Sequence, residues 1–386
     1  MLSASTLQFV LPDEFMQTPI AQDLLDGIRR WVEIESFTAD VDGVNRLITH
    51  VAEGYAKAGG RIERIAGRNG RGDHLAISSP WGGDKPGILL LAHLDTVHPP
   101  GTINTLPFRV EGDRAFGPGI FDMKGGAYLA FAAFRSIAGA GRTTPLPLRF
   151  LYTSDEEVGS QTSRGLIERA ADSAKYVLVV EPARDGKLIT ARKGIGDYLL
   201  EAEGRAAHAG SRHEEGRSAI LEVAKQVLAI EALTDYERGV TFNVGKIQGG
   251  TATNTVPQFC QAEIDMRINS LADAEEIERR LFSLRSHNPD VTIKVTGKLN
   301  RPPFEKNAGI AMLFDRAREL AKEIGFELAD CSTGSVSDGN FTAPKVPTLD
   351  GLGVDGAGGH TLQEHLFVSS LVPRMTLLRR LFETPT

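Results

Sequence analysis

Possible metal ligands stand at the ends of three apolar runs in this sequence. Each run is rich in large apolar residues, which favours a strand buried on both faces of a parallel sheet. The ligands are His93 after GILLLA, then Asp155, Glu156 and Glu157 after LRFLYTS, and Glu181 after YVLVV. In an open α/β sheet, ligands collect beyond the carboxyl ends of the strands. We therefore expect these side chains to meet at one edge of a sheet.

Three further residues could complete such a site. Asp95 lies on the same side of an extended chain as His93, so its carboxylate can accept the second imidazole N–H and fix the tautomer. Asp122 is flanked by glycines in GPGIFDMKGG, and His360 follows the glycine-dense GLGVDGAGG. Taken singly, each has an ordinary explanation as a hydrogen-bonded pair, a turn residue or part of a solvated loop.

Taken together, two histidines and several carboxylates without thiolates suit zinc, manganese or cobalt. Two such ions about 3.5–4 Å apart hold a carbonyl oxygen and a bridging hydroxide, while a carboxylate that binds neither ion moves protons. A shared aspartate, two terminal glutamates and a spare glutamate would supply the remaining groups. The inventory therefore predicts a di-metal hydrolase.

The composition limits the classes of protein that the chain can belong to. Its 386 residues suffice for roughly two to three domains, and 41% hydrophobic with 24% charged residues excludes wholesale disorder. With a net charge of −7, the chain lacks the excess of basic residues that is typical of nucleic-acid-binding domains. No apolar run approaches the roughly 20 residues of a membrane helix. The first residues, MLSASTLQFVLPDEF, lack the pattern of a secretory signal. We expect a cytoplasmic protein that binds neither nucleic acid nor membrane.

Two other classes of site are disfavoured. Cys260 and Cys331 are too few for a disulfide framework or a cysteine-rich zinc site. Gly351–Gly356 matches a dinucleotide fingerprint in form, but that motif needs a helix to start at its end, and GAGGH does not easily begin one. Neither feature competes with the di-metal interpretation.

The pattern of apolar residues predicts two domains. Helices are expected at 21–35, 43–58, 125–138 and 162–171, and strands at 74–79, 87–93, 148–154 and 176–181. From 193 to 303 the order is βαββαβ, which is typical of a ferredoxin-like domain, and the α/β pattern resumes at 304. We predict an α/β fold in which 1–192 and 304–386 form a mostly parallel sheet with helices on both faces, with an inserted ferredoxin-like domain at 193–303.

Several motifs resemble one known family along nearly the whole chain and in the same order. They are LLLAHLDTV, GPGIFDMKGG, TSDEEVGS, VVEP, AHAG and the final GGH. The sequence is similar to the metallopeptidases that include glutamate carboxypeptidase (folate-cleaving), acetylornithine deacetylase, succinyl-diaminopimelate desuccinylase and aminoacylase. The pattern is closest to glutamate carboxypeptidase. The resemblance implies that 193–303 is a lid and dimerisation domain, and that the chain forms a homodimer through it.

The resemblance also implies a ligand set for two divalent ions, most often zinc, with cobalt and manganese as alternatives. His93 and Glu181 would bind one ion, Glu157 and His360 would bind the other, and Asp122 would bridge them.

Further roles follow from the same resemblance. Asp95 would orient His93, and Glu156 would be the general base that activates water. The Asp122–Met123 peptide bond would be cis. His208, in AHAG, would stabilise the oxyanion of an active site, its own or the partner subunit's.

The substrate would be an N-acyl amino acid or a peptide, held by its carboxylate. Asn254 in GTATNTVP, Arg267 in EIDMRIN and Arg301 in LNRPPF match positions that grip this group, and the loop that begins at Gly334 would line the pocket. The loop TGSVSDGN differs from the TGGGTDAA form of folate-cleaving relatives, and Ile189 stands where a polar residue would help to hold a glutamate side chain. Glutamate specificity therefore stays open, as do two alternatives: an N-deacylase of the acetylornithine or desuccinylase type, and a non-catalytic metal-bound scaffold.

Overall fold

The computed structural model describes residues 19–385, so the opening segment that we expect not to be a secretory signal lies outside the described residues. The chain divides into two compact units, which are Met1–Thr190 with Lys306–Ser332 and Ser337–Thr386, and Ala191–Glu305 with Thr333–Val336. The second unit thus starts at Ala191 rather than 193 and ends at Glu305 rather than 303. It also includes Thr333–Val336, which lie within the predicted range 304–386 of the first domain.

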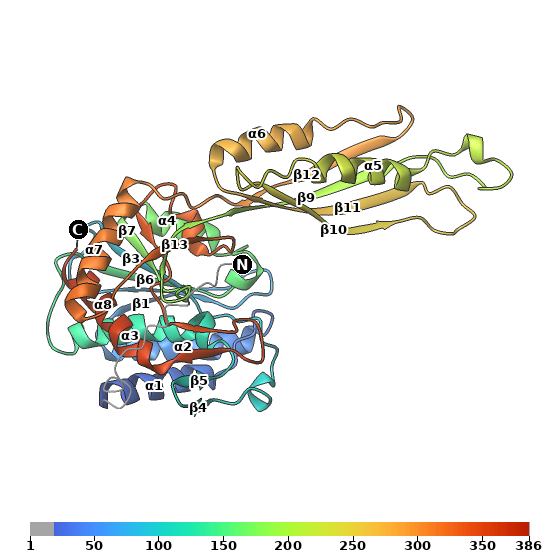
Figure 1. Cartoon of the computed structure of the whole chain (residues 1–386). Coiled ribbons are helices and arrows are strands. Elements are labelled where there is room, and N and C mark those ends of the chain that lie inside the picture. Colours follow the sequence, from blue (N-terminus) through green and yellow to red (C-terminus); the bar gives the residue numbers. More distant parts are fainter. Residues whose placement is uncertain (1–18, 386) are drawn as a thin grey trace. The chain divides into compact units, whose positions relative to one another are not determined.

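The first unit is built on a six-stranded sheet (Figure 1). Its strands, in spatial order, are β1(Arg61–Ile65), β2(His74–Ser78), β6(Leu148–Thr153), β3(Gly87–His93), β7(Ala174–Val179) and β14(Thr348–Leu349). The strands β6, β3, β7 and β14 run parallel to one another. β2 pairs antiparallel with both of its neighbours, β1 and β6. The α/β class is confirmed, but the sheet is mixed, because the short connection from β1 to β2 closes a hairpin that reverses the chain.

Helices cover both faces of this sheet, as predicted. They are α1(Pro19–Val32), α2(Val41–Lys57), α3(Gly125–Ala138), α4(Arg164–Ala171), α7(Ala308–Ile324) and α8(Leu371–Glu383). Alternate residues of β3 enter different cores: Leu90 packs in the core that holds α1, α2, α3, α7 and α8, whereas Leu91 packs with Ile167 of α4. Burial on both faces explains why every residue of β3 is buried and why its sequence is a continuous apolar run.

Short strands form a second sheet in the first unit. In spatial order they are β15(Gly356–Ala357), β16(His365–Phe367), β5(Arg114–Phe116) and β4(Arg109–Glu111). A separate pair is β8(Leu188–Arg192) with β13(Asp330–Thr333). Strands of two or three residues are too short for an alternating pattern, so the sequence did not predict them. No helix among residues 19–385 is both long and apolar enough to span a bilayer.

The second unit has the predicted βαββαβ order. Its elements are β9(Gly194–Glu203), α5(Ala219–Glu231), β10(Thr241–Gly249), β11(Phe259–Ile268), α6(Leu271–Phe282) and β12(Thr292–Arg301). The strands pair antiparallel in the spatial order β10-β11-β9-β12, and α5 and α6 lie on the same face of the sheet (Figure 1). The side chains of Ser218 and Ser270 cap the starts of the two helices by accepting backbone N–H bonds.

Candidate metal centre

Neighbouring strands carry the predicted ligands to one edge of the six-stranded sheet. His93 is the last residue of β3, Glu156 and Glu157 begin the short turn that follows β6, and Glu181 follows β7. Because β6, β3 and β7 are adjacent and parallel, their carboxyl ends meet. Asp122 comes from the turn Ile120–Lys124 that precedes α3.

His360 reaches the same place from the loop between β15 and β16. Its backbone φ of +64° is left-handed, a conformation that is uncommon for a residue with a side chain and that clusters at functional sites. Of the five predicted ligands, His360 and Asp122 are the two that come from loops and turns rather than from the ends of strands of the main sheet.

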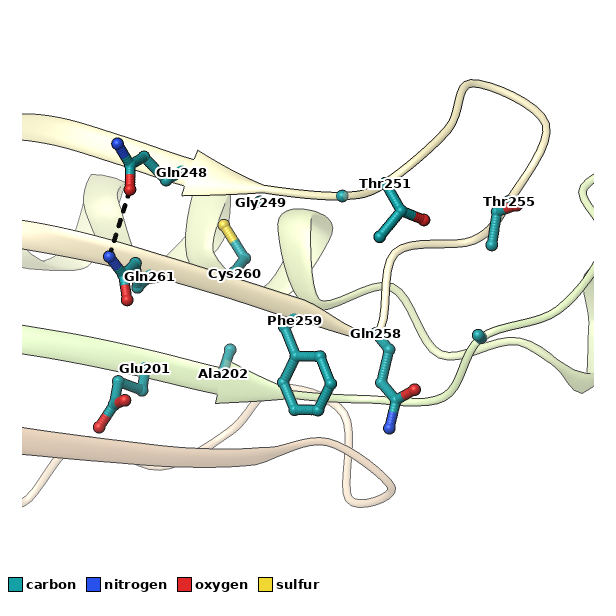
Figure 2. Close-up of a pocket in the computed structure, with 12 residues that line it drawn as sticks. Glu201, Ala202, Gln248, Gly249, Thr251, Thr255, Gln258, Phe259, Cys260 and Gln261 are labelled. Carbon is teal, nitrogen blue, oxygen red and sulfur yellow. Dashed lines mark hydrogen bonds between the residues drawn. The ribbon is translucent and has the colours of Figure 1, made fainter.

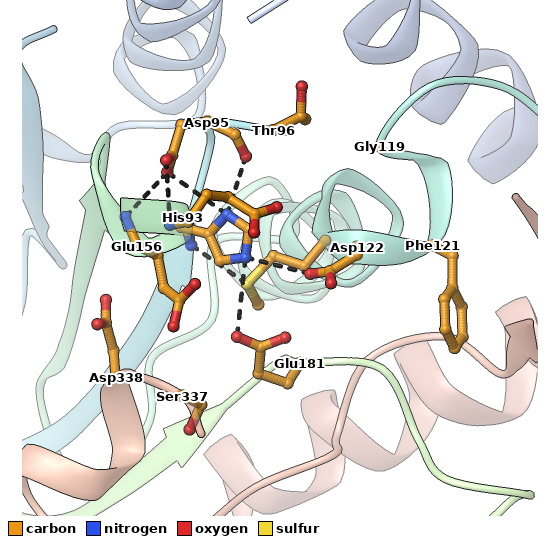
Figure 3. A network of polar contacts seen from close by, with 12 residues as sticks. His93, Asp95, Thr96, Gly119, Phe121, Asp122, Glu156, Glu181, Ser337 and Asp338 are labelled. Carbon is orange, nitrogen blue, oxygen red and sulfur yellow. Dashed lines mark hydrogen bonds and ion pairs between the residues drawn. The ribbon is translucent and has the colours of Figure 1, made fainter. Parts of the chain in front are cut away.

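Asp122 lies between two histidine–glutamate pairs. Its Oδ1 is 3.2 Å from His93 Nε2, and its Oδ2 is 3.2 Å from His360 Nε2. Glu181 Oε1 lies 3.7 Å from His93 Nε2, and Glu157 Oε2 lies 3.2 Å from His360 Nε2. The five side chains thus form two half-sites that share one carboxylate, and Figure 3 shows His93 facing Asp122 and Glu181.

The donor chemistry of this cluster fits divalent cations. One ligand atom from each of His93, Asp122 and Glu157 lies within 4.8 Å of the other two. Imidazole and carboxylate donors suit zinc, cobalt and manganese. Carboxylates crowded in this way repel one another unless a cation compensates their charge.

The pKa values of the cluster follow from burial and from these contacts. Burial raises the pKa of Glu157, and burial together with the charge of Asp122 raises the pKa of Glu181 well above its usual value. Burial opposes the charged form of His93, but hydrogen bonds to Asp122 and Asp95 raise its pKa well above normal. Hydrogen bonds to Asp122 and Glu157 raise the pKa of His360 to about 10.

Asp95 connects His93 with the turn that carries Glu156 and Glu157. His93 Nδ1 lies 2.9 Å from the backbone oxygen of Asp95 and 3.5 Å from its carboxylate, so the carbonyl is the nearer partner, rather than the carboxylate that we expected. The carboxylate instead accepts hydrogen bonds from Thr38 Oγ1 at 2.8 Å and from the backbone N–H groups of Glu156 and Glu157, each at 3.3 Å. One residue therefore fixes both the imidazole and the turn. The Asp122–Met123 peptide bond is cis, as expected.

The remaining predicted residues belong to the second unit. His208 is exposed, and its Nδ1 accepts the backbone N–H groups of Gly210 at 3.1 Å and Ser211 at 3.2 Å. In the neutral ring, the proton then lies on Nε2. The backbone oxygen of the exposed Asn254 accepts from Ala209 N at 2.9 Å, which ties the two predicted loops together.

Two arginines and one glycine complete the predicted substrate residues. Arg267 binds Asp265 through two nitrogens, Nε to Oδ1 at 2.8 Å and Nη2 to Oδ2 at 2.9 Å. Arg301 ends β12 and is 2% exposed. Gly334 is exposed, and a Cβ there would meet no atom within 4 Å, so the turn itself does not require glycine. Their part in substrate binding stays a prediction.

A pocket of about 670 Å³ lies on the sheet of the second unit (Figure 2). Gln248 and Gln261 face each other across two strands there, and Phe259 and Cys260 also line it. Its lining includes one carboxylate, that of Glu201, and no histidine. The pocket therefore does not compete with the first unit as a metal centre.

Four buried polar residues near the ligands escaped the sequence analysis: Thr38, His98, Lys124 and Glu364. A charged residue directly before the apolar run GGAYLAFAAF is the signal that could have marked Lys124, whereas Glu364 stands between Gln363 and His365 and has no such signal. Histidine and carboxylate ligands at the carboxyl edge of an α/β sheet are the arrangement of a metal-dependent hydrolase.

Comparison with known proteins identifies the family. The model of peptidase family M20/M25/M40 matches residues 89–384. The chain is 30% identical over 366 residues to carboxypeptidase G2 of Pseudomonas sp. (strain RS-16), covering 93% of this chain and 88% of that protein. It is 27% identical over 338 residues to the succinyl-diaminopimelate desuccinylase of Paracidovorax citrulli, covering 81% and 86%. The chain belongs to peptidase family M20/M25/M40 and is a metal-dependent hydrolase, so the resemblance seen in the sequence is confirmed.

Solved structures share the fold at lower identity. Aminopeptidase PepT from Bacillus cereus superposes with a TM-score of 0.79 at 22% identity, covering 94% of this chain and 98% of that one. Human carnosine dipeptidase 1 superposes with a TM-score of 0.66 at 15% identity, covering 96% and 97%.

Proposed function

We propose that the protein hydrolyses an amide bond whose amine side is an amino acid with a free carboxylate, such as an N-acyl-glutamate or the C-terminal residue of a peptide. The observation that carries this proposal is the position of Asp122 between the His93–Glu181 and His360–Glu157 pairs. The 30% identity to carboxypeptidase G2 across 93% of the chain supports the amide-bond chemistry.

Two divalent ions would occupy the two half-sites. His93 and Glu181 would hold one, His360 and Glu157 the other, and Asp122 both. We propose zinc, with cobalt or manganese as alternatives that the same donors accept. When bound, such ions supply the Lewis acidity that activates a carbonyl group and a water molecule.

Glu156 is the proposed general base. The turn after β6 places it next to the proposed ligand Glu157, at the carboxyl end of that strand. Glu156 takes a proton from the attacking water and passes it to the leaving nitrogen, so one residue serves as base and then as acid. Asp95 holds the backbone of this turn and thereby orients the base.

Substrate recognition is assigned to the second unit. His208, with Nδ1 occupied by backbone N–H groups, would donate its Nε2 proton to the developing oxyanion. Asn254, Arg267 and Arg301 would hold the substrate carboxylate, for which the planar guanidinium group is suited. The loop that begins at Gly334 would contact the bound substrate as well.

An N-deacylase of the acetylornithine or desuccinylase type is the second candidate. The 27% identity to a succinyl-diaminopimelate desuccinylase favours it. A non-catalytic metal-bound scaffold is the third and weakest candidate, because the ligand set and Glu156 are all present.

We also propose that the chain forms a homodimer through the second unit and acts in the cytoplasm. Apolar side chains of α5 are exposed, with exposed fractions of 41% for Ile220, 57% for Leu221 and 75% for Leu228. β10 lies at an edge of its sheet, where a second copy can pair with it. A dimer that buries both features would remove apolar surface and an open strand edge from water.

A panel of N-acyl amino acids and dipeptides tests the proposal. The metal-stripped protein and the protein loaded with Zn²⁺ are incubated with the panel, and the released amino acids are identified by mass spectrometry. Release of the carboxylate-bearing amino acid by the loaded protein, and not by the metal-stripped protein, supports the carboxypeptidase-like activity. Preference for one acyl group across many side chains favours the deacylase. Bound metal without hydrolysis of any amide favours the scaffold.

A further inference from the structure

A carboxylate outside the ligand set is buried beside the metal centre. Glu364 is 0% exposed and lies in the loop between β15 and β16, the loop that also carries His360. Burying a charge is costly unless hydrogen bonds and counter-charges compensate it. The contacts of Glu364 therefore show what its charge holds in place.

Both oxygens of Glu364 accept backbone N–H groups from the turn that carries Asp122. Oε1 accepts from Phe121 N at 2.9 Å and from Asp122 N at 3.0 Å, and Oε2 accepts from Gly119 N at 3.0 Å. Gly119 has a φ of +69°, and a Cβ there would lie 2.4 Å from Thr96 Cγ2, so the turn is confined on its outer side as well. Three backbone N–H groups of this turn therefore donate to one carboxylate.

A buried imidazole is a further hydrogen-bond partner of Glu364. His98 Nε2 lies 2.5 Å from Glu364 Oε2, and His98 itself is buried. Lys124, also buried, donates to the backbone oxygen of Ile34 at 2.9 Å, and the charge of Glu364 acts on it. The carboxylate is therefore held by donors on several sides, which gives the turn a rigid support.

We propose that Glu364 is a positioning residue that holds Asp122 between the two half-sites. One buried side chain joins the loop of His360 to the backbone of Asp122, and these two residues meet at 3.2 Å. Without this support, the Asp122 carboxylate would not be aimed at both histidines at once. The inference rests on the proposed metal centre, and it predicts that loss of Glu364 weakens metal binding although Glu364 itself is not a ligand.

Glu364→Gln tests the inference, because the amide keeps the shape but one of its two terminal atoms no longer accepts hydrogen bonds. The Zn²⁺ affinity of the metal-stripped full-length protein is measured by competition with a chromophoric chelator, and the visible absorption of the Co²⁺-loaded protein is recorded. We expect an affinity that is about 10- to 100-fold weaker for at least one equivalent of metal, with a changed Co²⁺ spectrum.

Glu35→Gln is the matched control. Glu35 also accepts two backbone N–H groups, from Gly101 at 2.8 Å and Ile103 at 3.0 Å, in a loop without a proposed ligand. We expect wild-type metal affinity and an unchanged Co²⁺ spectrum for this variant.

Unchanged affinity and spectrum in Glu364→Gln would overturn the inference. If that variant does not fold, His98→Gln decides in its place, because it removes the imidazole partner of Glu364 and leaves the backbone contacts of Glu364. Weaker metal binding by His98→Gln supports the inference, and wild-type binding overturns it. A wild-type protein that binds no divalent metal would instead contradict the proposed function.

Discussion

His360 Nε2 lies 3.2 Å from Asp122 Oδ2, although the two residues belong to loops far apart in the sequence. The other oxygen of the same carboxylate faces His93 at the same distance. In the proposed metal centre, this single aspartate is therefore common to both half-sites, whereas each glutamate belongs to one. Replacing Asp122 should therefore affect both half-sites, whereas replacing either glutamate should affect one.

Asp122→Ala is expected to lose both metal ions, while Glu181→Ala loses one. The aspartate variant removes a donor from each half-site, and the glutamate variant removes a donor only from the half-site of His93. Elemental mass spectrometry of the dialysed proteins measures the metal content and distinguishes the two variants. Equal metal content in both variants would contradict a shared aspartate.

Glu156→Gln is expected to reduce turnover by about 10²- to 10⁴-fold and to leave metal content near the wild-type value. The amide cannot take a proton from water, but it does not belong to either half-site. Steady-state rates and metal analysis of the same preparation check this. Glu168→Gln, at a half-buried position of α4 where the side chain pairs with Arg164, serves as the control and should keep full activity. Wild-type rates in Glu156→Gln would remove this residue from the mechanism.

His208→Ala is expected to lower kcat by about 10²- to 10³-fold, the usual effect of losing one oxyanion donor. KM and metal content should change little, because His208 lies in the second unit and is not among the proposed ligands. A rise in KM at constant kcat would assign His208 to substrate binding instead.

Glu222→Gln is expected to destabilise the second unit by about 2–3 kcal/mol at pH 7. Although burial alone would raise its pKa, hydrogen bonds from Gln226, His287 and Asn288 lower the pKa of Glu222 to about 2, from 4.5. A lowered carboxyl pKa stabilises the folded state fully above pH 4.5, and this contribution is lost as the pH falls toward 2.

Urea unfolding as a function of pH checks the Glu222 prediction. The gap in stability between wild type and Glu222→Gln should be constant above about pH 5.5 and narrow below the unfolded pKa of about 4.5. Glu275→Gln, at an exposed position of α6, should change stability by less than about 0.5 kcal/mol. A gap that does not depend on pH would contradict the titration of Glu222 as its cause.

Leu228→Lys is expected to shift the protein from dimer to monomer. Leu228 is 75% exposed on α5, and a charge there would have to be buried in the proposed interface. Light scattering after size-exclusion chromatography gives the mass. Met312→Lys, at a 57% exposed position of α7 in the first unit, is the control and should leave the mass unchanged. A monomeric wild type would end the dimer proposal.

The sequence by itself determined which residues stand at the carboxyl ends of β3, β6 and β7. A strand buried on both faces must be a continuous apolar run, so its last residue and the first polar residues after it can be recognised locally. His93, Glu181 and the acidic turn that contains Glu157 are recognised in this way, and the βαββαβ order of the second unit follows from the same kind of pattern. The identity of the donors also indicated the class of metal.

Only the tertiary structure decided how the loops close around these residues. The strands β5, β15 and β16 are two or three residues long, so their pairing, which places His360 beside Asp122, leaves no periodic signal. The Asp95 carbonyl rather than its carboxylate is the nearer partner of His93, at 2.9 Å against 3.5 Å, and a difference of this size is set by packing. The burial of Glu364 depends on donors from Gly119, Phe121 and Asp122, which the sequence separates by more than two hundred residues from it. Such contacts arise from packing in three dimensions, because no local pattern specifies which backbone groups a distant side chain will meet.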